Sequence, residues 1–235
     1  MALEINNKPI ELKEGQELVE WAPIYDEIDT GLQIMKFYED VDKNLILTLN
    51  TFVQFIQGVD EEIYHNNLTL PAFAINPNAK RCLILGGGDG LAARTIFEHK
   101  SDVEITLVEL DKKMVEVFKT YPRLLEMNKN SLSQCSVYIE NALYWVPRNS
   151  SKIFDVVILD FPDPTSWELK KLYHKDFLSD VAYLLGENGV ISIQCNPEIA
   201  ELVADLTKEI LGNSAVINYE MPNLGCGKIV IGRKE

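Results

Sequence analysis

The sequence has few features that would direct the protein to a membrane or a nucleic acid. It contains no run of 18 consecutive apolar residues, and its first residues show no positive segment followed by an apolar stretch. Positive charge is also scarce, because 22 Lys and Arg stand against 36 Asp and Glu, for a net charge of -14. Phosphate backbones would meet repulsion from this excess of negative charge. We therefore expect no membrane and no nucleic-acid partner.

Metal-binding and disulfide patterns are missing as well. The four cysteines show no C-x-x-C spacing, and Cys82 and Cys195 lie in apolar runs, as reduced buried thiols usually do. The three histidines show neither H-x-x-x-H nor H-E-x-x-H spacing. The expectations are a cytoplasmic location and no metal site.

What is present is a regular alternation of strand and helix patterns from about residue 82 onward. Such alternation predicts an α/β fold, with a parallel sheet covered by helices on both faces. Two further strand patterns near the C-terminus have no helix between them and predict an antiparallel pair at one sheet edge. Parallel strands are expected at 82–86, 103–110, 135–140, 154–160 and 189–195, and the antiparallel pair at 214–221 and 228–233.

The N-terminal part has a different texture, with short alternating segments broken by Asp, Asn and Gly. We interpret residues 1–70 as a small antiparallel β domain whose last part contains a short helix. Residues 71–235 are then a Rossmann-like domain of the methyltransferase type. The prediction is a larger α/β domain preceded by a smaller β domain.

A glycine loop, "LILGGGDGLAAR", stands between the first parallel strand and the first helix. Glycines there let a ligand lie on backbone N–H groups at the helix N-terminus. Glu109 ends the next strand, where a nucleotide fold needs an acid for ribose hydroxyls, and Asn141 follows the third strand, where an amide can pair with adenine. These features favour a nucleoside site over the alternative, a tight turn followed by a helix-capping acid.

A stiff acidic turn, "DFPDP", directly follows the fourth strand. Pro162 and Pro164 restrict the backbone around Asp160 and Asp163, so the two carboxylates are held before any ligand arrives. The alternative is a strand-end turn whose aspartates bond their own backbone. An acidic pair of this kind suits the binding of a cation.

Taken together, five motifs resemble those of the polyamine aminopropyltransferases, the family that includes spermidine synthase. They occur in the order "VDEEIYH", "LGGGDGLAAR", "LVELD", "DFPDP" and "LYHKDFL", and the resemblance runs from about Gln54 to the C-terminus. The "YPRLLEMNKNSL" stretch and the "DFPDP" form look closest to members whose synthase domain is often fused to membrane segments. The resemblance implies a homodimer and no cofactor, with decarboxylated S-adenosylmethionine as a co-substrate.

The resemblance also implies roles for individual residues. Asp160 matches the catalytic residue, which would orient the amine and accept its proton with a pKa raised by burial beside Asp163. The residues expected to hold the donor are Gly86, Gly88, Asp89, Gly90, Glu109 and Asn141. Those expected to hold the amine are Asp163, Tyr64, Gln54 and His65, with helix packing as the alternative for His65. Acids of the "VDEE" segment would hold a second ammonium group.

Two positions depart from the family pattern. Asn141 stands where the family generally has an aspartate, and Leu224 stands where many spermidine synthases place a tyrosine over the amine site. The implied reaction is aminopropyl transfer to a di- or polyamine, with putrescine as the first candidate. A small-molecule methyltransferase and a non-catalytic nucleoside-binding protein remain as alternatives. Trp145, Trp167 and Phe177 are interpreted as packing residues.

Overall fold

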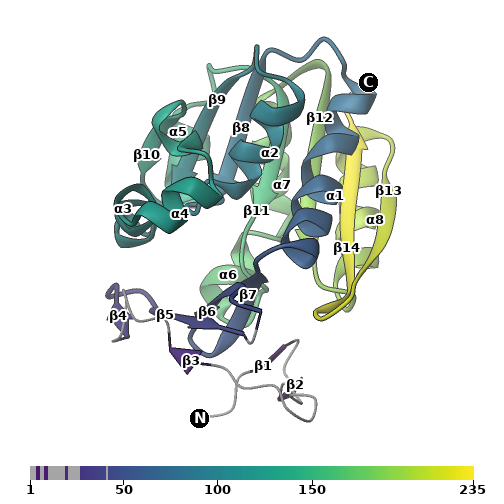
Figure 1. Cartoon of the computed structure of the whole chain (residues 1–235). Coiled ribbons are helices and arrows are strands. Elements are labelled where there is room, and N and C mark those ends of the chain that lie inside the picture. The colour runs from purple at the N-terminus through teal and green to yellow at the C-terminus, as the bar shows by residue number, and fades with distance from the viewer. Residues whose placement is uncertain (1–3, 6–7, 10–18, 21–26, 41) are drawn as a thin grey trace. The chain divides into compact units, whose positions relative to one another are not determined.

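The computed structural model describes residues 4–5, 8–9, 19–20, 27–40 and 42–235. The chain divides into two compact units (Figure 1). The first comprises Met1–Tyr64 and Glu220–Cys226, and the second comprises His65–Tyr219 and Gly227–Glu235.

The first unit is built on β-strands. The strands are β1 (Glu4–Ile5), β2 (Lys8–Pro9), β3 (Val19–Glu20), β4 (Ile28–Asp29), β5 (Ile34–Glu39), β6 (Leu45–Leu49) and β7 (Phe52–Ile56). Their order is β2-β1-β7-β6-β5-β3, and β4 pairs with β5. The antiparallel meander β5-β6-β7 buries Met35 and Phe37 on one face of β5, as period-two alternation requires. This meander confirms the expected N-terminal β structure.

The second unit contains a mixed seven-stranded sheet. Its strands are β8 (Arg81–Gly86), β9 (Glu104–Glu109), β10 (Ser136–Ile139), β11 (Phe154–Asp160), β12 (Leu185–Cys195), β13 (Ala215–Met221) and β14 (Gly225–Arg233). Residues 220–221 of β13 and 225–226 of β14 belong to the first unit. The order is β10-β9-β8-β11-β12-β14-β13, with parallel pairing through β12 and antiparallel pairing of β12 with β14. The predicted α/β class and the C-terminal strand pair are confirmed.

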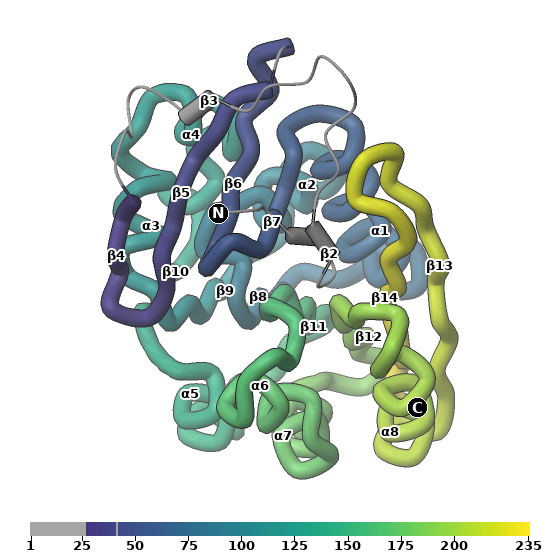
Figure 2. The backbone as a smooth tube through the Cα atoms, turned by 90° about the horizontal axis from the view of Figure 1, so that it is seen from below, coloured from purple at the N-terminus to yellow at the C-terminus, as the bar shows by residue number. Residues whose placement is uncertain are grey.

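Helices cover both faces of this sheet. They are α2 (Leu91–His99), α3 (Lys112–Thr120), α4 (Pro122–Met127), α5 (Ala142–Arg148), α6 (Trp167–Lys171), α7 (Lys175–Tyr183) and α8 (Ala200–Leu211), with a 3-10 turn at Ser131–Ser133. Figure 2 shows α2 and α3 along one face, and α5, α7 and α8 along the other. None of the helices in the described part of the chain is long and apolar enough to cross a membrane.

Helix α1 (Val59–Ile75) is longer than the short helix that the sequence predicts. Pro71 lies inside it, although proline usually ends a helix because it lacks the N–H and crowds the preceding turn. The prediction for Trp167 is also wrong, because its side chain is 71% exposed. Trp145 and Phe177 are buried in the core, as expected.

The parallel arrangement brings the chemistry-bearing residues to one edge of the sheet. Strand β8 ends at Gly86, β9 at Glu109 and β11 at Asp160. Carboxyl ends of parallel strands lie at the same edge, where ligands of open α/β sheets bind. The candidate site is therefore at the carboxyl edge of β8, β9 and β11.

Candidate active site

The glycine turn lies directly against the end of β11. Gly86 is the register partner of Asp160, and its φ of 88° is in the left-handed region. A Cβ at Gly86 would lie 2.1 Å from the carbonyl oxygen of Asp160. Only glycine fits there, because both the backbone angle and the close approach exclude a side chain. The turn is thereby locked beside Asp160, for which the family resemblance implies a catalytic role.

Glu109 closes the other side of the same turn. Its carboxylate accepts hydrogen bonds from the N–H of Gly88 at 3.0 Å and the N–H of Asp111 at 2.7 Å. Burial is the main cause that raises the pKa of Glu109 to about 7, and the two backbone donors offset part of that rise. Near neutral pH the ionised and the protonated form of this carboxyl group are therefore both populated, and a ligand that donates hydrogen bonds would favour the ionised form.

Residues 128–131, which follow α4, hold the backbone of the glycine turn through hydrogen bonds. The buried Asn128 side chain donates through Nδ2 to the carbonyl oxygens of Asp89, at 2.9 Å, and Phe118, at 3.2 Å. The buried Ser131 hydroxyl donates to the carbonyl oxygen of Gly90 at 2.6 Å. These bonds hold both peptide groups at the start of α2, so the glycine turn is held in place before a ligand binds.

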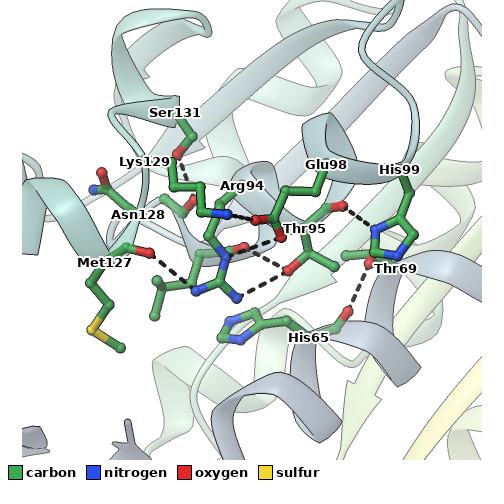
Figure 3. A network of polar contacts seen from close by, with 12 residues as sticks. His65, Thr69, Arg94, Thr95, Glu98, His99, Met127, Asn128, Lys129 and Ser131 are labelled. Carbon is green, nitrogen blue, oxygen red and sulfur yellow. Dashed lines mark hydrogen bonds and ion pairs between the residues drawn. The ribbon is translucent and has the colours of Figure 1, made fainter. Parts of the chain in front are cut away.

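Arg94 on α2 ties this segment to the helix (Figure 3). Its guanidinium donates to the carbonyl oxygen of Met127 at 3.1 Å and to the Thr95 hydroxyl at 3.3 Å. Glu98 lies 3.8 Å from its Nε and forms a second ion pair with Lys129. These contacts could not be predicted from the sequence, because they join residues of α2 to the end of α4 and the segment that follows it.

Asp89 and Asn141 each hold the start of a helix. The Asp89 carboxylate accepts from the N–H of Leu91 at 2.9 Å, in the first turn of α2. The Asn141 side-chain oxygen accepts from the N–H of Leu143 at 2.9 Å and caps α5. An amide oxygen has a second lone pair, so the expected adenine contact would share this atom with the cap.

Asp160 and Asp163 stand at the two ends of the acidic turn. Asp160 is half-buried, and a Cβ at Gly87 would lie 3.2 Å from its Oδ2. The carboxylate therefore faces the glycine turn. Asp163 lies three residues on, and its carbonyl oxygen accepts from the N–H of Thr165 at 2.7 Å. Asp160 thus adjoins the glycine turn, and Asp163 stands further along the same acidic turn.

The Asp163 carboxylate is held by amide side chains. Gln194, near the end of β12, donates to Asp163 Oδ1 at 3.2 Å, and Asn196 is a second hydrogen-bond partner. Burial raises the pKa of Asp163, and the two amides lower it in part. The alternative in which the turn's aspartates serve only their own backbone is therefore insufficient for Asp163.

Three residues of this network were missed by sequence reasoning: Gln194, Asn196 and Tyr173. Gln194 is a polar residue near the end of an apolar strand, which is a weak signal for a site at that edge. Tyr173 belongs to the "LYHKDFL" motif without a role of its own in the sequence analysis, and its hydroxyl lies 2.9 Å from Gln194 Oε1. The sequence alone does not link Gln194 with Tyr173, because the two residues lie in separate elements of the chain.

The expected amine-binding residues of the first unit occupy β7 and α1. Gln54 lies in β7, where its side-chain amide donates to the carbonyl oxygen of Phe52 at 3.2 Å, and Tyr64 is half-buried on α1. Their contacts with an amine stay predictions. His65, the first residue of the second unit, is buried, and its carbonyl oxygen accepts from the Thr69 hydroxyl at 2.7 Å (Figure 3).

One acid of the "VDEE" segment already has a structural partner. Asp60 is buried and accepts from the backbone N–H of Asn223 at 3.1 Å and from its side-chain amide at 2.5 Å. It therefore holds the Pro222–Asn223 turn, close in sequence to the buried Leu224. The expected contact with a second ammonium group stays a prediction for Glu61 and Glu62.

Comparisons with known proteins agree on one family. The family described as "Spermine/spermidine synthase domain" matches residues 61–222. A polyamine aminopropyltransferase of Leptospira interrogans is 41% identical over 63% of this chain and 30% of its own length. A polyamine aminopropyltransferase 2 of Bacillus cereus is 34% identical over 85% of this chain and 52% of its own length. The chain thus spans from about a third to about half of these relatives.

Solved structures show the same fold. A spermidine synthase in complex with the transition state analogue AdoDATO has a TM-score of 0.77 at 24% identity, over 86% of this chain and 71% of that one. A spermidine synthase from Thermotoga maritima has a TM-score of 0.75, also at 24% identity, over 86% of this chain and 70% of that one. The family match covers most of the chain, and the motifs at the carboxyl edge lie within it. The chain belongs to the spermine/spermidine synthase domain family.

Proposed function

We propose that the protein transfers the aminopropyl group of decarboxylated S-adenosylmethionine to a di- or polyamine and releases methylthioadenosine. The observation that carries this proposal is the placement of Asp160, whose carboxylate faces the glycine turn from the end of β11. An acid there lies beside the position of a nucleoside sulfonium and can hold an attacking amine. The relatives named as polyamine aminopropyltransferases support the same reaction.

The reaction is a displacement at carbon. The lone pair of a neutral amine attacks the methylene next to the sulfonium, the carbon–sulfur bond breaks, and methylthioadenosine leaves as a neutral thioether. The product keeps its charge as a secondary ammonium, so the one proton released is the proton that the attacking amine gives up before the displacement. No acid is needed for the leaving group, so the chemical demand falls on the nucleophile, which has to be neutral and correctly aligned.

Deprotonation of the amine is the difficult part. Proton transfer from an ordinary alkyl ammonium to an ordinary aspartate is unfavourable by roughly 9 kcal/mol. The positive sulfonium and a second ammonium on the substrate lower the pKa of the attacking amine and so reduce this gap. Asp160 orients the amine and accepts its proton, while Asp163 attracts the substrate's charge.

The proposal that decarboxylated S-adenosylmethionine is the donor depends on the negative charge of Asp89 in the glycine turn. Asp89 places a carboxylate next to the Gly88 and Gly90 backbone, at the start of α2. A carboxylate there attracts the bare aminopropyl ammonium and repels the carboxylate of intact S-adenosylmethionine. Equal binding of the two sulfonium compounds would contradict this proposal. Many methyltransferases carry their acid before the loop, where this chain has Ile84.

An amine panel tests the reaction. The purified protein is incubated with decarboxylated S-adenosylmethionine and each amine, and products are identified by mass analysis. We expect putrescine to react at least about tenfold faster than butylamine, because a lost charge-assisted contact costs about 1.5 to 3 kcal/mol. Equal rates for the two amines would show that the second charge is not recognised.

Nucleoside affinity should depend on pH through Glu109. The pKa of this group is raised to about 7, so below that pH the free protein carries a protonated, weaker acceptor for ribose hydroxyls. We expect the Kd of methylthioadenosine to be constant above about pH 8. Below that pH the Kd should rise, with a slope that approaches about tenfold per pH unit. Calorimetric titration measures this dependence.

The control is Glu109→Gln, which removes the titrating group and keeps the side-chain size. The Kd of this variant for methylthioadenosine should be higher than that of the wild type at high pH, and it should be nearly independent of pH. A wild-type Kd that does not change between about pH 5.5 and 8.5 would show that the raised pKa of Glu109 is not coupled to nucleoside binding.

A further inference from the structure

Tyr173 sits where one buried hydroxyl faces several oxygen atoms. It lies between α6 and α7, is 7% exposed, and its hydroxyl is 2.9 Å from Gln194 Oε1. The carbonyl oxygens of Phe161 and Pro162, in the acidic turn, lie 3.3 Å away. All three neighbours are acceptors, so the hydroxyl has to donate, and the shortest of the three distances is to Gln194.

This donor and the Asp163 carboxylate together favour one orientation of the Gln194 amide. With Oε1 toward Tyr173, the NH₂ group points to Asp163 and donates to Oδ1 at 3.2 Å. The flipped amide would place its oxygen against the Asp163 carboxylate, and its NH₂ would face the hydroxyl, which could accept it only while donating to a carbonyl oxygen at the longer distance of 3.3 Å. The Asp163 carboxylate therefore disfavours the flipped orientation, and the observed orientation also gives the tyrosine proton its shortest hydrogen bond, at 2.9 Å.

The orientation matters because Asp163 is partly buried. Gln194 and Asn196 are its hydrogen-bond partners among side chains, and both stabilise its ionised form. If the amide turned freely, Asp163 would lose one donor and would be harder to ionise. A protonated Asp163 attracts an ammonium group far less strongly than a carboxylate does.

We propose that Tyr173 is a positioning residue for amine binding: its hydroxyl orients the Gln194 amide, which in turn holds Asp163 as an ionised acceptor beside Asp160. This inference rests on the proposed function for its effect on the amine, but the chain of hydrogen bonds exists without a ligand. Tyr173 also joins the acidic turn to β12, which keeps Asp163 in one place. The hydroxyl of Tyr173 carries this positioning role, whereas its ring packs in the hydrophobic core.

The variant that isolates the hydroxyl is Tyr173→Phe, which keeps the ring and removes one oxygen. We expect the KM for putrescine to rise about threefold to tenfold, the range for one lost hydrogen bond, with kcat changed by less than about threefold. The acidic limb of the pH profile of kcat/KM for the amine should move to higher pH, because Asp163 becomes harder to ionise. The affinity for methylthioadenosine should stay unchanged.

Two comparisons make this test specific. Tyr183→Phe is the matched control, since Tyr183 lies on α7 and is 67% exposed, and it should behave as the wild type. In a Gln194→Leu background, Tyr173→Phe should add little, because both changes remove the same contact to Asp163. Additive losses, or equal losses of amine and nucleoside affinity, would overturn the positioning role and indicate general damage to the fold.

A measurement without turnover separates this inference from the proposed function. The Asp163 carboxyl can be titrated by carbon NMR in the ligand-free protein, and its pKa should be higher in Tyr173→Phe than in the wild type. An unchanged pKa would overturn the positioning role even if the enzyme is active. If the wild type transfers no aminopropyl group but the pKa still rises, the proposed function fails and the positioning of Asp163 stands.

Discussion

Asp160→Asn is expected to lower kcat by at least about a hundredfold, the low end for loss of a general base, with nearly unchanged affinity for methylthioadenosine. The substitution keeps the size and planar shape of the side chain but replaces the basic carboxylate with a neutral amide. Asp160 ends β11, while the expected nucleoside contacts come from the ends of β8, β9 and β10. Turnover and nucleoside binding should therefore separate in this variant.

The matched control is Asp176→Asn, whose side chain on α7 is 91% exposed. It should retain wild-type turnover, and methylthioadenosine titrations of both variants should overlap with that of the wild type. Near-normal turnover in purified, folded Asp160→Asn would remove Asp160 from the reaction. A parallel loss of nucleoside affinity would instead place its role in donor binding.

Gly88→Ala is expected to weaken methylthioadenosine binding by about tenfold to a hundredfold, the range for losing a charge-assisted contact. A Cβ at this position would lie 2.6 Å from Glu109 Cγ and 2.8 Å from Oε2, so the carboxylate would have to leave the turn. Gly88 is absent from the glycines with positive φ, so alanine can adopt its backbone conformation. The loss should therefore arise at Glu109 and leave the fold intact.

The control for this variant is Gly186→Ala, where the new methyl group would approach Ile153, away from the carboxyl edge. It should leave nucleoside affinity unchanged. In a Glu109→Ala background, Gly88→Ala should add little, since the group that it displaces is already gone. Full additivity of the two losses, measured by calorimetry, would show that Gly88 acts on the ligand directly and not through Glu109.

The fold was accessible to sequence reasoning because its signals are local. Each parallel strand is a short apolar run next to a helical pattern, and the structure places every expected strand close to the predicted residues. Helix α1 was underestimated because Pro71 is a local signal that the surrounding packing overrides. Trp167 was misassigned since a large apolar residue is buried only when its element has a covered face, and α6 buries none of its side chains.

Only part of the candidate site could be predicted from the sequence, because sequence signals are local. The glycine turn and the acidic turn are contiguous stretches, so their residues could be named from sequence spacing. The Asn128 and Ser131 contacts to the turn, and the link from Tyr173 through Gln194 to Asp163, join residues from separate elements. Hydrogen bonds of this kind depend on three-dimensional packing, which sequence periodicity does not specify.

Asn141 bears on the non-catalytic alternative. An amide in place of the family's aspartate can still accept a hydrogen bond, although its oxygen already caps α5. A protein that only binds a nucleoside would not require the acidic turn or the amide-held Asp163. These features favour turnover over simple binding.

The measurement that tests aminopropyl transfer most directly is a competition between two donors. The protein is mixed with putrescine and equal amounts of decarboxylated and intact S-adenosylmethionine, and the amine products are analysed by mass. We expect the mass gain of an aminopropyl group on putrescine, equimolar methylthioadenosine, and no methylated amine, because Asp89 disfavours the intact donor. A methylated product formed together with S-adenosylhomocysteine, without aminopropyl transfer, would contradict the proposed reaction and establish a methyltransferase in its place.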